Sequence, residues 1–412
     1  MERKIYLIDV ILIVLLLFNE SFFYLFSSTN LTVITSIFSI LLGLCGLIQR
    51  NKYPKIMICF IVLALIGNVL SICYSTYAYS QGMVAGLGNI NRYFIYLSYL
   101  FFYPYYSNRD NLNRLLKLIV NISFIIAILC IVQAFLYPKI VFFKDYAVRD
   151  GNIRLYAVTS LLSNVSISFL IYEFMKNKKV VAIVKLLTIF LAIVFGFRSR
   201  GYIIFTALSI VLSIYLYLLV FGKNKTKSAV KIFSPIIILG IFFVGYLIFD
   251  ETINSIANEI ETSSGSGATR VNELIYYFGC LKENIIFGLG TVTGDLAKDV
   301  YGTNLYWYYM EDTGALSVIF KLGIFGIAWL LNYFIIIFGS IKRSLKQKNS
   351  FVFVISVYLA VSTTVGIFYN NDIASRGTIF LTVIAMIMLS EVWSKKGVLS
   401  NDIYSDTNVS KS

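Results

Sequence analysis

Long runs of apolar residues recur along almost the whole chain, and they constrain its fold more than any other feature. A helix that crosses a bilayer needs about 20 such residues, because every backbone polar group there has to be bonded within the helix. Hydrophobic residues make up 58% of the 412 and charged residues only 14%, which is too little charge for a soluble chain. We therefore expect an all-α polytopic membrane protein with about 12 transmembrane helices. The predicted spans lie near residues 5–26, 31–48, 56–74, 90–106, 115–137, 157–175, 180–197, 202–221, 232–249, 314–338, 351–369 and 377–393.

The connections between these runs alternate in charge. Every second connection carries a cluster of lysine and arginine, as in Lys176/Lys178/Lys179, and such clusters mark cytoplasmic loops. This alternation predicts a multi-pass protein of the cell membrane with both termini in the cytoplasm, including a tail at 394–412. It also explains the net charge of +14 without nucleic acid as a partner. No small-residue cleavage site follows the first run, so we expect it to be retained. The other connections are expected to face outward: 27–30, 75–89, 138–156, 198–201, 250–313 and 370–376.

The connection 250–313 is much longer than the others. We expect a single integral membrane domain, 1–412, with 250–313 as a large extracytoplasmic loop between spans 9 and 10. Within it, apolar residues recur at helical spacing from Arg270 to Lys282, which predicts an amphipathic helix on or in the outer interface, with Thr269 as its N-cap. A tight turn is expected at 287–290. The residues expected to form one apolar face of the helix are Val271, Leu274, Ile275, Phe278 and Leu281.

The outward connections hold arginines that the charge rule does not explain. Arginine binds phosphate through a planar fork and keeps its proton, so arginines at the outer surface suit a lipid-linked diphosphate. Arg200 and Arg376 each follow a serine and precede a glycine at the start of an apolar run, where free N–H groups also attract anions. The alternative is that these arginines meet lipid headgroups or nearby carboxylates. The outward arginines are Arg149, Arg154, Arg198, Arg200, Arg270 and Arg376.

Carboxylates are the plausible general bases, because the chain has no histidine. We single out Glu273 and Asp312 as catalytic candidates. Glu273 follows Arg270 by one helical turn, so these two side chains are also placed to pair with each other. Lys321 is expected inside the tenth span, where it either reaches the outer surface or lines a polar cavity. No D-x-D motif occurs, which disfavours a metal-bridged nucleotide-sugar transferase, and we expect neither a metal nor a cofactor.

A set of short motifs resembles the O-antigen ligase and polymerase superfamily. Glu283–Gly290 is similar to its N-P-x-x-G-x-G turn, and Ser199-Arg200-Gly201 is similar to its S-R-G/S element. Arg270 falls where such proteins carry an arginine ahead of the glycine turn. The resemblance covers roughly residues 195–330. Its last part comprises Asn304-Leu305-Tyr306, Glu311-Asp312-Thr313-Gly314 and Lys321-Leu322-Gly323-Ile324-Phe325-Gly326.

The resemblance implies a function and a set of roles. Ligases of this superfamily typically show a His-Asn pair where this chain has Thr303-Asn304, which favours the Wzy-type polymerase branch. That branch would transfer a growing glycan from undecaprenyl diphosphate to a second lipid-linked repeat unit at the outer leaflet. Arg200 and Arg270 would hold the diphosphate, supported by Arg198 and Arg376. Implied partners are undecaprenyl-diphosphate-linked oligosaccharides, the bilayer, a chain-length regulator and a flippase. The alternatives are a lipid-linked oligosaccharide flippase or transporter, and an O-antigen ligase.

Overall fold

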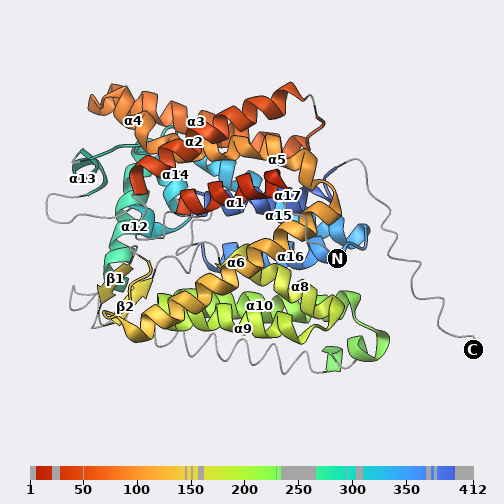
Figure 1. Ribbon diagram of the computed structural model, residues 1–412. Helices are drawn as coiled ribbons and strands as arrows, with labels where there is room; N and C mark the ends of the chain where they lie inside the picture. Colours follow the sequence, from red (N-terminus) through yellow and green to blue (C-terminus); the bar gives the residue numbers. More distant parts are fainter. Residues whose placement is uncertain are drawn as a thin grey trace, which may run out of the picture.

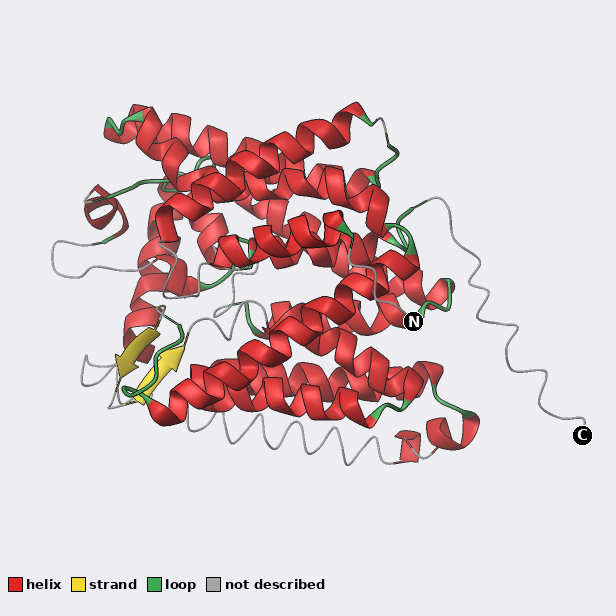
Figure 2. Ribbon diagram, in the orientation of Figure 1, coloured by secondary structure: helices red, strands yellow, loops and turns green. Residues whose placement is uncertain are grey.

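The protein folds into a bundle of helices, which we describe from a computed structural model (Figures 1 and 2). The structure describes residues 6–20, 28–49, 51–143, 146–149, 152–155, 162–228, 230–232, 266–294, 296–302, 310–367, 373–374 and 378–394. The first half contains α1 Leu7–Glu20, α2 Ser28–Ile48, α3 Lys55–Tyr79, α4 Met83–Ile90, the 3-10 helix η1 Asn91–Leu97, α5 Ser98–Tyr106, α6 Arg109–Leu136, the π-helix η2 Leu162–Ile167, α8 Ser168–Asn177, α9 Val180–Ala192, the π-helix η3 Ile193–Phe197 and α10 Arg200–Phe221. The second half contains α12 Ser266–Glu283, α13 Leu296–Tyr301, the 3-10 helix η4 Met310–Thr313, α14 Leu316–Leu322, α15 Ile324–Lys346, α16 Ser350–Val365 and α17 Ile379–Ser390.

The helices follow the apolar runs of the sequence. Every predicted span overlaps one or more of these helices except 232–249, which lies outside the described residues. Among the described helices, five are long and apolar enough to cross a membrane on their own. The chain is therefore a helical membrane protein, and the count of about 12 crossings stays a prediction. The five are Lys55–Tyr79, Arg109–Leu136, Val180–Phe197, Gly201–Phe221 and Ile324–Lys346.

The two kinds of connection lie at opposite ends of the bundle. The lysine- and arginine-rich connections after α2, α5, α8, α10 and α15 lie at the right in Figure 1. The connections after α3, α6 and η3 lie at the left, together with α12 and α13 (Figure 1). The alternation of charge in the sequence thus corresponds to an up-and-down path of the chain.

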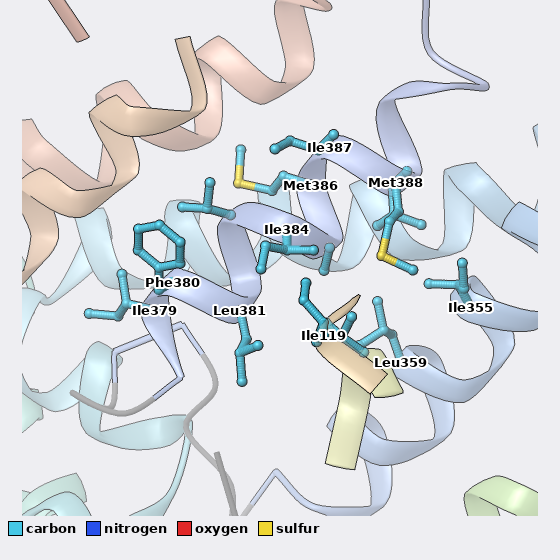
Figure 3. Close-up of a cluster of buried hydrophobic side chains, with 14 of the residues drawn as sticks. Ile119, Ile355, Leu359, Ile379, Phe380, Leu381, Ile384, Met386, Ile387 and Met388 are labelled. Carbon is cyan, nitrogen blue, oxygen red and sulfur yellow. The ribbon is translucent and has the colours of Figure 1, made fainter. Parts of the chain in front are cut away.

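The helix α17 forms the centre of the bundle. All twelve of its residues are buried, and a helix that is apolar on every side is stable only when surrounded. Figure 3 shows its side chains among Ile119 of α6 and Ile355 and Leu359 of α16. The predicted outward connection that carries Arg376 leads directly into this central helix.

A small β-hairpin departs from the expected all-α fold. The strands β1 Tyr146–Arg149 and β2 Asn152–Leu155 pair antiparallel, with Ala147 opposite Arg154. The side chain of Gln133, near the end of α6, fixes the chain that leads into the hairpin. Its Oε1 accepts hydrogen bonds from the backbone N–H groups of Phe142 and Phe143, each at 2.8 Å. The sequence predicted a plain loop here, because four-residue strands show too little alternation to be recognised.

A buried ion pair ties α1 to α5 and α6 near the lysine-rich end. Asp9 is 1% exposed, and its carboxylate accepts a hydrogen bond from Arg114 Nε at 2.8 Å and another from the Tyr106 hydroxyl at 2.8 Å. The Arg114 guanidinium also lies over the Tyr6 ring, 4.2 Å from its centroid. Asp9 therefore holds the first helix against α5 and α6.

Replacing Asp9 with asparagine should lower stability without changing the volume of the side chain. The variant keeps a neutral hydrogen-bond acceptor but leaves the Arg114 charge without its counter-ion, at a cost of about 2 kcal/mol. The measurement is the thermal unfolding midpoint of purified protein in detergent. Asp110→Asn is the matched control, because Asp110 is an exposed carboxylate at the same end of α6. Equal midpoints for the two variants would contradict a stabilising role for the Asp9 pair.

Candidate functional site

Backbone hydrogen bonds join the glycine turn, residues 285–290, to the break between α14 and α15 at Gly323. We call this unit the clasp. The backbone N–H groups of Leu289 and Gly290 donate to the carbonyls of Phe320 (2.8 Å) and Lys321 (3.1 Å). In return, the Ile324 N–H donates to the carbonyl of Ile285 at 2.9 Å. The end of one helix and the start of the next leave backbone groups without helical partners, and the turn satisfies them. Two motifs more than thirty residues apart in the sequence therefore form one unit.

Only glycine fits the two positions where these segments touch. Gly288 and Gly323 have φ angles of +63° and +56°, a region that other residues rarely adopt. A Cβ on Gly288 would lie 2.4 Å from the Phe320 carbonyl oxygen, and a Cβ on Gly323 would lie 2.4 Å from the Ile285 oxygen. The close approach of backbone to backbone thus explains why glycines recur in both motifs.

The break at Gly323 corrects the predicted tenth span. The sequence placed a continuous helix over 314–338, whereas the structure has the short α14 Leu316–Leu322 followed by the long α15 Ile324–Lys346. Lys321 therefore lies in the short helix before the break and not two turns inside a long span. Its Nζ is 6.0 Å from the centroid of the Tyr301 ring. The apolar run continues through the break, so hydropathy alone did not reveal it.

A buried glutamine connects the turn to the α3–α4 corner. Gln81 Nε2 donates to the Thr291 carbonyl at 3.0 Å, and Gln81 Oε1 accepts from the Thr293 N–H at 2.8 Å. The hydroxyls of Ser71 in α3 and Thr291 lie 2.8 Å apart. These bonds hold the strand-like segment after the glycines against the membrane bundle. Gln81 belongs to no sequence motif, so its role could not be recognised before the structure was known.

Replacing Gln81 with alanine should loosen this segment locally. The variant removes both bonds to the backbone of Thr291 and Thr293, and the Thr293 N–H loses its acceptor. A loss of about 1–2 kcal/mol corresponds to roughly tenfold faster amide exchange. Hydrogen–deuterium exchange of peptides covering 290–294 measures it, with Gln347→Ala as control because Gln347 bonds a backbone carbonyl at the other end of the bundle. Unchanged exchange at 290–294 would show that Gln81 does not hold the segment.

The described parts of the large loop have a small core of their own. The hydroxyl of Tyr277, in α12, donates to the Tyr301 carbonyl at 2.9 Å, and the Tyr301 hydroxyl donates to the Gly290 carbonyl at 2.6 Å. Burial raises the pKa of Tyr277, and the neighbouring Glu273 raises it further. Tyr277 therefore remains protonated and keeps donating well above neutral pH. The core brings α12, α13, η4 and α14 together, with buried residues Tyr277, Leu281, Leu289, Val292, Tyr301, Met310 and Phe320.

The predicted amphipathic helix is present, and the side of it that packs against the protein is not the predicted apolar face. The helix α12 begins at Ser266 in the described residues, so Thr269 lies within it and is not its N-cap. Glu273 (2% exposed) and Tyr277 (0% exposed) face inward, whereas Ile275 and Phe278 are 67% and 47% exposed. Leu281 is buried as expected. The inward side of α12 thus includes the polar Glu273, which the spacing of apolar residues in the sequence does not indicate.

The two catalytic candidates lie on elements that pack against each other. Glu273 is on the inward face of α12, and Asp312 is in η4, which contacts both α12 and α14. The side chain of Asp312 is exposed, whereas that of Glu273 is buried. Arg270 precedes Glu273 by one turn in the same helix. Geometry thus distinguishes two carboxylates that the sequence left equivalent.

The structure describes only some of the outward arginines that the sequence analysis singled out. Arg198 has a left-handed backbone with φ of +55°, and its Nε donates to the Phe195 carbonyl at 2.8 Å, so it caps the π-helix η3. Arg200 is the first residue of α10. The strand β2, which carries the half-buried Arg154, packs against η3. Arg376 lies outside the described residues, and the side chains of Arg149, Arg200 and Arg270 do as well.

Comparison of the chain with models of known protein families and with curated proteins gives no match. Among the described residues, no group of three or more aspartate, glutamate or cysteine side chains is arranged to hold a metal ion. The features that bear on function are therefore the sequence motifs, the contact between the glycine turn and the helix break, and the inward side of α12.

Proposed function

We propose that this protein is a polysaccharide polymerase. It transfers a growing glycan from undecaprenyl diphosphate to a second lipid-linked repeat unit at the outer leaflet of the cell membrane. In this proposal the chain crosses the membrane about 12 times, both termini are cytoplasmic, and a flippase and a chain-length regulator are partners. The glycine-rich clasp then lies at the outer surface.

The observation that carries the proposal is the interlocking of the glycine turn with the helix break. The superfamily resemblance rests on a glycine turn and on a later G-x-x-G, and in this chain Gly288 and Gly323 meet backbone to backbone. Their contact supports the view that the motif match reflects a shared local architecture and is not chance. The clasp also fixes the position of α12, which carries Arg270 and Glu273.

The proposed reaction forms one glycosidic bond and breaks one bond to phosphate. A hydroxyl oxygen of the acceptor sugar attacks the anomeric carbon of the donor glycan. The bond from that carbon to the diphosphate oxygen breaks, and undecaprenyl diphosphate leaves with the electron pair. Arg200 and Arg270, supported by Arg198 and Arg376, stabilise the negative charge of the leaving diphosphate. Glu273 accepts the hydroxyl proton, and Asp312 is the second candidate for this role.

The test uses purified protein in liposomes with a lipid-linked repeat unit and no nucleotide sugar. Wild-type protein should produce a ladder of longer lipid-linked glycans on a gel. The double variant Arg200→Ala with Arg270→Ala should lose the ladder, because the diphosphate would lose both of its main cationic contacts. The matched control is Lys139→Ala with Lys282→Ala, which removes two exposed cations from the same end of the bundle and should keep the ladder.

Three results would count against the proposal. A double variant that is folded and still gives wild-type polymer length and yield would refute the proposed arginine mechanism. Movement of the repeat unit across the bilayer without a ladder would favour a flippase. Transfer of glycan only to a different acceptor would favour a ligase.

A further inference from the structure

Four large apolar side chains on the loop region are largely exposed, although the Phe278 ring also packs edge to face against Phe320, with ring centroids 5.1 Å apart. Ile275 and Phe278 of α12 are 67% and 47% exposed, and Ile285 and Ile286 of the glycine turn are 59% and 55% exposed. We call these four residues the α12 apolar patch. On the opposite side of the same helix, Glu273 and Tyr277 are buried, so the outward direction of the patch is fixed by packing on the inward side.

The patch continues the apolar surface of a membrane-spanning helix. In α15, the exposed apolar residues Ile324, Leu331, Ile335 and Phe338 recur at spacings of seven, four and three, which places them on one side of the helix. The first of them, Ile324, is bonded through its N–H to the Ile285 carbonyl at 2.9 Å. The helix α15 is one of the five that are long and apolar enough to cross a bilayer, and its exposed stripe is the surface that acyl chains contact.

The exposed surface of α12 is divided between apolar and polar residues. With 3.6 residues per turn, Phe278 lies on one flank of Ile275, whereas the exposed Asn272 and Glu283 lie on the other. Lys282, seven residues after Ile275, is exposed on the same side of the helix near its end, where a long cationic side chain extends beyond its apolar neighbours to reach lipid headgroups. The helix runs across the end of the bundle and not along it (Figure 1). An apolar flank beside a polar flank is the pattern of a helix that lies in a membrane interface.

We propose that the α12 apolar patch is immersed in the acyl chains of the adjacent leaflet, so that α12 lies in the membrane interface. The occupant is lipid because the patch is continuous with the lipid-facing stripe of α15, through the backbone hydrogen bond from the Ile324 N–H to the Ile285 carbonyl. Immersion removes four large apolar side chains from water, while Asn272 and Glu283 stay hydrated. This inference does not depend on the proposed polymerase activity.

Nitroxide side chains at single positions of the full-length protein in lipid nanodiscs test the depth of the patch. The five native cysteines, Cys45, Cys59, Cys73, Cys130 and Cys280, are first replaced by serine or alanine, and retained folding is checked by the unfolding midpoint. Separate Ile275→Cys, Phe278→Cys and Ile285→Cys variants are then labelled. Asn272→Cys and Glu283→Cys are the matched controls on the other flank.

The expected result is a reversal of reagent accessibility between the two flanks. Labels at 275, 278 and 285 should collide more with oxygen, which is enriched among acyl chains, than with a water-soluble nickel chelate. Labels at 272 and 283 should show the opposite order. The proposal is overturned if 275 and 285 are as accessible to the nickel chelate as 272. It is also overturned if they are shielded from both reagents, because a second copy of the chain would then cover the patch.

Discussion

Replacing Gly323 with alanine should lower the free energy of unfolding by about 3 kcal/mol, of which roughly 1–2 kcal/mol comes from the left-handed backbone. The rest comes from overpacking, since the new Cβ would lie 2.4 and 2.5 Å from the carbonyl oxygens of Ile285 and Ile286. Both contacts are with backbone, so no side chain can rotate to relieve them. The structure can respond only by separating the glycine turn from the helix break, which also exposes the carbonyls that the turn satisfies.

The matched control for this change is Gly279→Ala in α12. A Cβ at Gly279 has no heavy atom within 4 Å, and alanine in a helix interior is favoured over glycine by roughly 0.5–1 kcal/mol. The two alanines should therefore move the thermal unfolding midpoint in opposite directions. A Gly323→Ala midpoint equal to wild type would show that the two segments do not touch as described.

Replacing Glu273 with glutamine should slow polymerisation by about 10²–10⁴-fold, the usual contribution of a general base. Glutamine has nearly the same shape as glutamate, so the inward packing of α12 beside Tyr277 is retained while the proton acceptor is lost. The rate of ladder formation in liposomes measures the effect. Binding of the lipid-linked donor should change little, because the proposed contacts with the diphosphate come from the arginines and not from Glu273.

Asp312→Asn distinguishes the two carboxylates. Asp312 is exposed, whereas Glu273 is 2% exposed, and a base that works away from water is better protected from competing hydrolysis of the donor. We expect Asp312→Asn to keep most of the activity. If Asp312→Asn stops polymerisation and Glu273→Gln does not, the roles are reversed. If Glu273→Gln lowers the unfolding midpoint as much as the activity, its role is structural.

The sequence predicted most of the helices because hydropathy is a local signal. The limits of α9 with η3 and of α10 lie within a few residues of the predicted spans, and the helix around Glu273 was expected from its apolar spacing. The glycine turn was also expected, because its glycines, Gly288 and Gly290, are only two positions apart in the chain.

The remaining features depend on contacts between distant residues. Gly323 breaks a continuous apolar run because the turn at Ile285 approaches it, and nothing within the run itself indicates that approach. Gln81 bonds Thr291 and Thr293 across more than two hundred positions. The sequence did not indicate which side of α12 faces the protein, because Glu273 and Tyr277 are buried through contacts with α13, η4 and α14, which are distant in the chain.

The burial of α17 on every side has a consequence for biosynthesis. Chains emerge from the ribosome N-terminus first, and α17, Ile379–Ser390, is the last of the described helices. Its position at the centre is therefore unfilled until the other described helices have been synthesised, and those helices lack their common neighbour until then. The described bundle is completed by α17, so its native packing is reached only once this helix has entered the membrane.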